Sequence, residues 1–149
     1  MARLIIRSFP RLTLFLPLLL ASCAVMLVGP YDPVTDAALQ DLAKNTEIFI
    51  ADVTLSHDSY SERAKFYREA EGSLRAIEMR ASLYPKNEAE LELLAKLRAA
   101  FGNLRSIHQE VGPFRQREAE GVRSLLRSLL HHELSKKRSA GVGAPAATP

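Results

Sequence analysis

Four histidines and one neighbouring glutamate could in principle bind a metal ion together. The histidines are His57, His108, His131 and His132, and Glu133 follows the last two. Metal sites in helical bundles are usually built from Glu-x-x-His pairs, because residues three or four apart share one face of a helix. No Glu-x-x-His or His-x-x-x-His spacing occurs in the sequence, and adjacent residues on a helix project about 100° apart. The pattern therefore predicts no metal site and favours histidines at the surface or near a helix end.

Nucleophilic chemistry has equally little support. Cys23 is the only cysteine, so the chain can form neither an intramolecular disulfide nor a thiolate metal cluster. The sequence contains no Gly-x-Ser-x-Gly turn around a serine and no glycine-rich phosphate loop. We therefore expect no catalytic residues and no cofactor.

The residues before Cys23 have the order of an export signal. Arg3, Arg7 and Arg11 precede an apolar run from Leu12 to Leu20, and no acidic residue lies among them. These three arginines also account for the net charge of +3, since the remaining 17 basic residues equal the 17 acidic ones. A nucleic-acid-binding surface needs clustered positive charge, so no nucleic-acid partner is expected.

Leu20, Ala21, Ser22 and Cys23 resemble the lipobox of bacterial lipoproteins, in which an aliphatic residue and two small residues precede a cysteine. The resemblance implies cleavage after Ser22 and lipid attachment at Cys23, so that the protein contacts a lipid bilayer through its acylated cysteine. Residues 1–22 would be the signal peptide, and residues 23–31 the lipid anchor and linker. In lipoproteins of bacteria with two membranes, an acidic residue after the cysteine usually marks retention in the inner membrane; this chain has Ala24 there, so the resemblance implies the outer membrane, facing the periplasm.

Two alternatives stay open for this segment. The apolar stretch continues to Val28, so residues 12–28 have about the 17 residues of a short membrane span, and the chain could keep an uncleaved signal anchor. Pro17 interrupts the run and argues against a span. The other alternative is a soluble secreted product. Both anchored forms place the following domain outside the cytoplasm, because the arginines stay inside.

Behind this segment, apolar residues at steps of three and four predict amphipathic helices. The four segments run over about 33–53, 60–83, 87–110 and 113–137. Short connections between them give an all-α fold, a small antiparallel helical bundle of about four helices over residues 32–138. Residues 139–149 are rich in Ala, Gly and Pro and predict a disordered tail.

Local signals mark the ends of these segments. Asp32 before Pro33 predicts an N-cap followed by the residue favoured at the first helical position. Asn87 and Glu90 have the spacing of a capping box. Gly72 lies inside the second helix, where glycine is unfavourable by roughly 1 kcal/mol relative to alanine, so we expect it to mark a close contact between helices.

Two patterns concern binding. Tyr60, Tyr67 and Tyr84 share one helical stripe, which is core in most proteins. The alternative is a groove for a small ligand or lipid, lined by Tyr60, Tyr67 and Leu74. Residues 32–58 hold six acidic residues and one basic, whereas residues 115–138 hold seven basic and three acidic. We favour side-by-side packing of these two segments over contact of the basic one with anionic lipid, because surface pairs are worth only about 0 to 1 kcal/mol each.

Segments 29–36, 85–88, 104–108 and 133–137 resemble short motifs of a group of small proteobacterial lipoproteins with no assigned activity. The resemblance covers most of residues 20–138. With the features above, it leads us to expect a membrane-anchored envelope lipoprotein that acts as an interaction or structural module with envelope proteins as partners. A small-ligand or lipid-binding bundle is the alternative.

Overall fold

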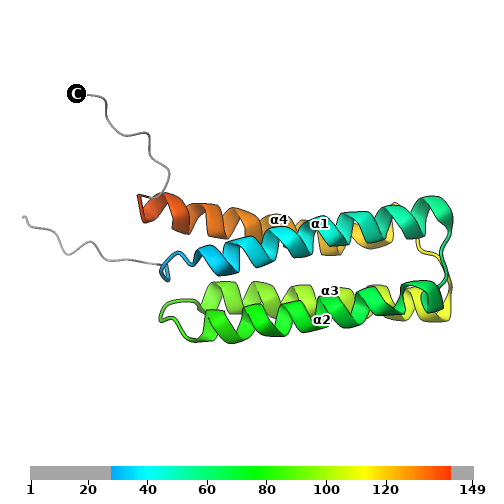
Figure 1. Ribbon diagram of the computed structural model, residues 1–149, viewed down its shortest axis with the longest axis horizontal. Helices are drawn as coiled ribbons and strands as arrows, with labels where there is room; N and C mark the ends of the chain where they lie inside the picture. Colours follow the sequence, from blue (N-terminus) through cyan, green and yellow to red (C-terminus); the bar gives the residue numbers. More distant parts are fainter. Residues whose placement is uncertain (1–27, 142–149) are drawn as a thin grey trace, which may run out of the picture.

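The computed structural model describes residues 28–141 and shows four antiparallel α-helices packed side by side (Figure 1). These helices are α1 (Pro33–Ser56), α2 (Tyr60–Ser82), α3 (Glu88–Glu110) and α4 (Gln116–Ser139). α1 packs against α2 and α4, and α3 packs against the same two helices. The predicted all-α antiparallel bundle is confirmed.

The core forms where the apolar stripes of the four helices meet. On α1 every residue predicted for the apolar face is buried: Leu39, Leu42, Thr46, Phe49, Ile50 and Val53. α3 and α4 add a leucine-rich stripe of Leu94, Leu97, Leu104, Leu126 and Leu129. Apolar area removed from water is the main favourable term in folding, so this shared interior holds the four helices together.

The start of α1 forms as predicted. Asp32 caps the helix, because its Oδ1 accepts a hydrogen bond from the backbone N–H of Val34 at 3.1 Å. The hydroxyl of Thr35 donates to Asp32 Oδ2 at 2.8 Å. α1 continues about one turn past the predicted end at Val53, and it stops where His57 adopts a left-handed conformation with φ of 59°.

The capping box predicted at Asn87 and Glu90 is wrong. The side-chain amide of Asn87 donates instead to the backbone oxygen of Ala81, at 3.0 Å, and closes the turn between α2 and α3. Glu90 is fully buried against α4, where it meets Lys136. Asn87 and Glu90 have the spacing of a capping box, but Asn87 bonds to the end of α2 and Glu90 pairs with Lys136 of α4.

The start of α4 also differs from the prediction. α4 begins at Gln116 rather than at Pro113, because the Phe114 side chain turns into the core and Glu118 accepts a hydrogen bond from the backbone N–H of Arg115 at 2.7 Å. α4 ends at Ser139, two residues beyond the expected boundary, and a turn follows to Gly141. The rest of the predicted tail, residues 142–149, lies outside the described residues.

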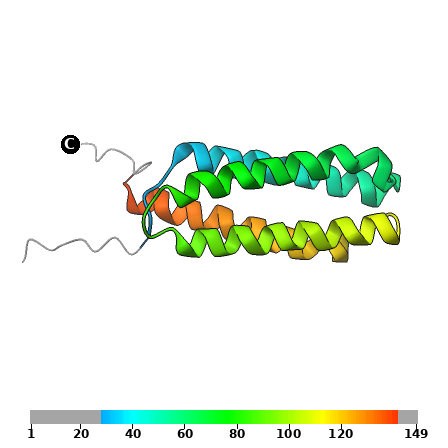
Figure 2. The same cartoon turned by 90° about the horizontal axis from the view of Figure 1, so that it is seen from below.

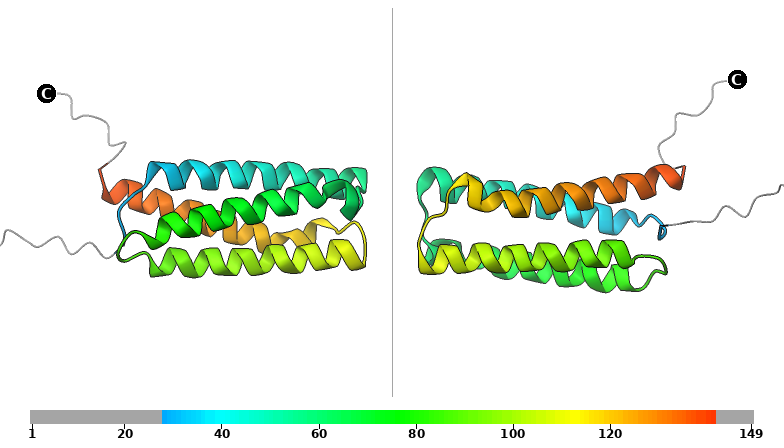
Figure 3. Two further views of the ribbon diagram at one scale, coloured as in Figure 1. Left: turned by 60° about the horizontal axis from the view of Figure 1, so that its bottom comes forward. Right: turned by 180° about the vertical axis from the view of Figure 1, so that it is seen from behind.

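The bundle has two distinct ends. The start of α1, the connection between α2 and α3, and the end of α4 lie together at one end, as the blue, green and red ribbon segments show (Figures 2 and 3). The connections from α1 to α2 and from α3 to α4 lie at the other end. Within the described residues, none of the helices combines the length and apolar composition that a membrane span requires.

Candidate functional site

The predicted lipid-attachment residue Cys23 and the preceding Leu20, Ala21 and Ser22 lie outside the described residues. The structure does show where the residues that precede α1 contact the rest of the bundle. The backbone N–H of Gly29 donates to the backbone oxygen of Lys86 at 2.9 Å, in the α2–α3 connection. Any anchor at Cys23 is therefore attached to the bundle end that contains this connection.

In the stripe of Tyr60, Tyr67 and Leu74, the last two side chains are buried in the core, Tyr60 is partly exposed, and Tyr67 also borders a small surface pocket between α2 and α3. Leu74 is fully buried, and only 5% of Tyr67 is exposed. The rings of Tyr60 and Tyr67 stack with their centroids 5.8 Å apart. Tyr67 also meets the ring of Phe49 edge-on at 5.1 Å, so it contributes to the aromatic core between α1 and α2.

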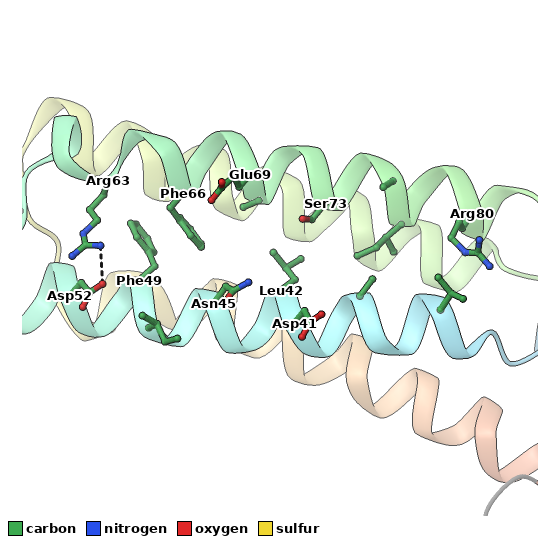
Figure 4. Close-up of a pocket in the computed structure, with 16 residues that line it drawn as sticks. Asp41, Leu42, Asn45, Phe49, Asp52, Arg63, Phe66, Glu69, Ser73 and Arg80 are labelled. Atoms are coloured by element: carbon green, nitrogen blue, oxygen red, sulfur yellow. Dashed lines mark ion pairs between the residues drawn. The ribbon is translucent and has the colours of Figure 1, made fainter.

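A groove of about 540 Å³ runs along the outer seam between α1 and α2 (Figure 4). Short side chains create it: Ala38 from α1 and Ala70, Ser73 and Ala76 from α2. Where two helices pack through such residues, no bulky side chain fills the space above the contact. In the sequence, the groove corresponds to small residues at steps of three in α2, namely Ala70, Ser73 and Ala76. These residues indicate a groove only once α1 is known to pack beside them.

Ion pairs stand at both ends of the groove. At one end Arg63 of α2 contacts Asp52 of α1, with Nη1 and Oδ2 3.0 Å apart (dashed in Figure 4). At the other end Arg80 donates to both carboxylate oxygens of Asp32, at 2.9 and 3.1 Å. The hydrogen bonds from Arg80 lower the pKa of Asp32 to about 2 despite partial burial. These pairs hold α1 and α2 in register along the groove.

The walls between the two ion pairs are partly apolar and partly acidic. Val34 and Ile48 of α1 line the groove, and 53% and 52% of their surfaces remain exposed. They lie 14 residues apart, which is about 21 Å along a helix. Asp41 and Asn45 lie between them, and Glu69 faces them from α2. This arrangement suits an elongated partner with apolar side chains and a central basic or hydrogen-bonding group.

A second polar cluster lies in the interior between α3 and α4. Lys136 forms ion pairs with two carboxylates, Glu90 of α3 and Glu133 of α4, and all three side chains are almost completely buried. One ammonium therefore faces two carboxylates, and several of their oxygens have no hydrogen-bond partner. Burial raises the pKa of Glu133, Lys136 opposes the rise, and the Glu90 carboxylate adds to it.

The predicted histidines fall into different environments. His57 and His131 are exposed. His132 is half-buried beside the Lys136 cluster, and burial lowers its pKa. His108 lies in the last turn of α3, at a helix end as expected, but it is fully buried rather than at the surface, because a tyrosine and a backbone oxygen satisfy its two nitrogens. No group of three His, Cys, Asp or Glu side chains with metal-binding geometry occurs within residues 28–141.

The acidic and basic segments do pack side by side, as α1 and α4. Arg123 of α4 donates to both carboxylate oxygens of Glu47 of α1. The other α1 pairs lie toward α2, where Asp32 and Asp52 meet its arginines. Arg127 pairs with Glu120 inside α4. Glu47 thus pairs with α4, whereas Asp52 and the capping residue Asp32 pair with α2.

None of three comparisons, with protein-family models, with curated proteins and with solved structures, found a match to this chain.

Proposed function

We propose that this protein is a lipid-anchored module of the bacterial cell envelope that binds an elongated protein partner in the groove between α1 and α2. The groove carries the proposal, because it exposes Val34 and Ile48 on a seam that has an ion pair at each end. An amphipathic helix with a basic residue opposite Asp41 and Glu69 has the matching chemistry.

The proposed anchor is the acylated Cys23, which would hold the bundle on the periplasmic face of the outer membrane. Support comes from the order of Arg3, Arg7 and Arg11, the apolar run and the small residues before the cysteine. Metabolic labelling with palmitate tests this part. The wild-type chain should be labelled, and Cys23→Ala should not be labelled or normally processed. Absence of label on the wild type would remove the anchor from the proposal.

A photoreactive diazirine residue at Ser73 of the full chain tests the groove in living cells. Ser73 lies in the groove wall, and Ser128 of α4 is also an exposed serine but lines none of the described pockets. Irradiation should give a discrete adduct of protein mass at position 73 and none at position 128. The same adduct at both positions, or at neither, contradicts the proposal.

One observation supports a small ligand or lipid as a second candidate. A volume of about 540 Å³ falls within the range of small-molecule sites. The same photocrosslinking experiment separates the two candidates, because mass spectrometry of the position-73 adduct distinguishes a peptide from an added mass of a few hundred daltons, as expected for a drug-sized ligand.

A further inference from the structure

The bundle end where the chain joins exposes two large aliphatic side chains. Leu83 caps the end of α2 and is 75% exposed, and Met79 lies four residues earlier with 68% exposed. Residues four apart lie on one face of a helix. Leu83 and Met79 therefore form one apolar patch beside the α2–α3 connection, at the end that also holds the start of α1 (Figure 3).

Two contacts fix the incoming chain next to this patch. Gly29 hydrogen-bonds to the backbone of Lys86, and it is buried against the Asn87 side chain. A Cβ atom at position 29 would collide with the Asn87 side-chain oxygen, so the close approach requires glycine. Asn87 is itself held by its hydrogen bond to the end of α2. The chain thus leaves the bundle within a few residues of Leu83.

The length of chain before Gly29 then limits how far this end can lie from a membrane. Cys23 is six residues away, a span of at most about 20 Å when fully extended. In the alternative of an uncleaved signal anchor, the apolar run ends at Val28, directly before Gly29. The opposite end of the bundle lies farther away by the length of α2, about 35 Å.

We propose that Leu83 and Met79 insert into the interface of the lipid bilayer and set the bundle upright on the membrane. The inference rests on the proposed membrane anchoring. Because the tether keeps the patch close to the lipid surface, a weak apolar contact is enough to hold the orientation. The groove between α1 and α2 then extends away from the membrane, where a periplasmic partner can reach it.

Apolar contact, rather than charge, accounts for this orientation. Lys86, Lys137 and Arg138 lie at the same end, but the acidic Asp36 and Glu88 lie there as well. A mixed surface gives little net attraction to anionic lipid, and salt would screen what there is. The contact should therefore form on zwitterionic lipid and persist in high salt.

Because the chain contains no tryptophan, single-tryptophan variants can report the orientation. The lipidated full chain carrying Leu83→Trp or Val111→Trp is reconstituted into phosphatidylcholine vesicles, with and without brominated acyl chains. Val111 is 81% exposed and follows α3 at the far end of the bundle, so it is the matched control. Trp at position 83 should show blue-shifted emission and lose most of its intensity to brominated lipid, whereas Trp at position 111 should show neither change.

Vesicle flotation separates failure of the anchor from failure of the inference. If the wild-type chain does not float with the vesicles, the anchoring proposal and this inference both fall. If the chain floats but the two tryptophans are quenched alike, the anchoring stands and the inserted patch is overturned. Loss of the quenching at position 83 in high salt would also overturn it, because apolar insertion does not depend on charge. Circular dichroism of both variants confirms that each is folded.

Discussion

Tyr67 and His108 join α2 to α3 through a buried hydrogen bond, with Oη and Nδ1 3.1 Å apart. The other ring nitrogen, Nε2, lies 2.9 Å from the backbone oxygen of Asp58. A carbonyl oxygen only accepts, so Nε2 carries the proton and donates to it. In the neutral ring Nδ1 then accepts from the tyrosine hydroxyl. One histidine thus ties α3 to both α2 and the connection that precedes it.

Removing the hydroxyl of Tyr67 should destabilise the bundle. Tyr67→Phe leaves Nδ1 of His108 buried without a donor, and such a group costs about 1–3 kcal/mol. Urea denaturation followed by circular dichroism measures the change in the free energy of unfolding. Tyr60→Phe is the control, because the Tyr60 hydroxyl accepts only from Arg105 at the surface. Equal losses in both variants would show that the Tyr67–His108 bond adds nothing specific.

The sequence made the fold of the bundle predictable, because the apolar stripe of each helix gives its buried face directly. Leu39, Phe49 and Val53 were expected in the core and are there. His108 was not, since a polar residue near a helix end ordinarily lies at the surface. Its burial depends on Tyr67 and Asp58, which lie 41 and 50 residues away along the chain. No local pattern contains such a pairing.

Glu133→Gln should stabilise the bundle at neutral pH. Burial raises the pKa of Glu133 above its ordinary value of 4.5, so the folded state holds the proton more tightly than the unfolded state. The stability that Glu133 contributes is complete below pH 4.5 and is lost as pH rises through the raised pKa. Glutamine cannot ionise, so the variant should keep that stability at neutral pH and should show a flatter dependence of unfolding free energy on pH.

The charged groups that act on Glu133 are Glu90 on α3, Lys136 on α4 and Asp36 on α1, and the titratable His132 lies beside the same cluster. Glu92→Gln is the matched control on the surface of α3, where the hydrogen bond from Lys96 lowers the pKa of Glu92. This control should lose a little stability at neutral pH. The prediction is contradicted if Glu133→Gln is less stable than wild type at neutral pH and its unfolding free energy depends on pH as the wild type's does.

Two glycines should respond to alanine in opposite directions. A Cβ atom at Gly72 would meet nothing within 4 Å, so the expected close helix contact is absent there. Gly72→Ala should therefore stabilise the bundle by about 0.5–1 kcal/mol, through better helix propensity. Gly29→Ala should destabilise it by about 1–3 kcal/mol, because the methyl group collides with Asn87. Thermal melts of the two variants beside the wild type test both signs, and a stabilising Gly29→Ala would contradict the fixed chain attachment.

The groove between α1 and α2 could not be predicted from the sequence alone. Alanine and serine at positions 70, 73 and 76 have good or moderate helix propensity and give no sign of function on their own. They line a groove only because α2 packs against α1 in this register, in which Arg63 and Arg80 also pair with Asp52 and Asp32. The proposed lipid-attachment site at Cys23 is the opposite case, because the prediction comes from the local order of residues, and those residues lie outside the described part of the chain.

The pair of Glu47 and Arg123 gives a direct test of the charge difference between α1 and α4. Arg123→Glu should lower the free energy of unfolding by about 1 kcal/mol, because two carboxylates then face each other at a partly exposed site. Adding Glu47→Arg restores opposite charges with their positions exchanged, so the double variant should recover most of the loss. Arg127→Glu, which disturbs only a pair within α4, is the control and should change stability less.

If the basic helix instead faces anionic lipid, Arg123→Glu and Arg127→Glu should both weaken salt-sensitive binding of the lipidated chain to vesicles containing phosphatidylglycerol, and Glu47→Arg should not restore it. We expect recovery of stability and unchanged vesicle binding, because the Arg123 guanidinium already donates hydrogen bonds to Glu47 of α1, and Glu118, Glu120 and Glu133 lie among the bases of α4.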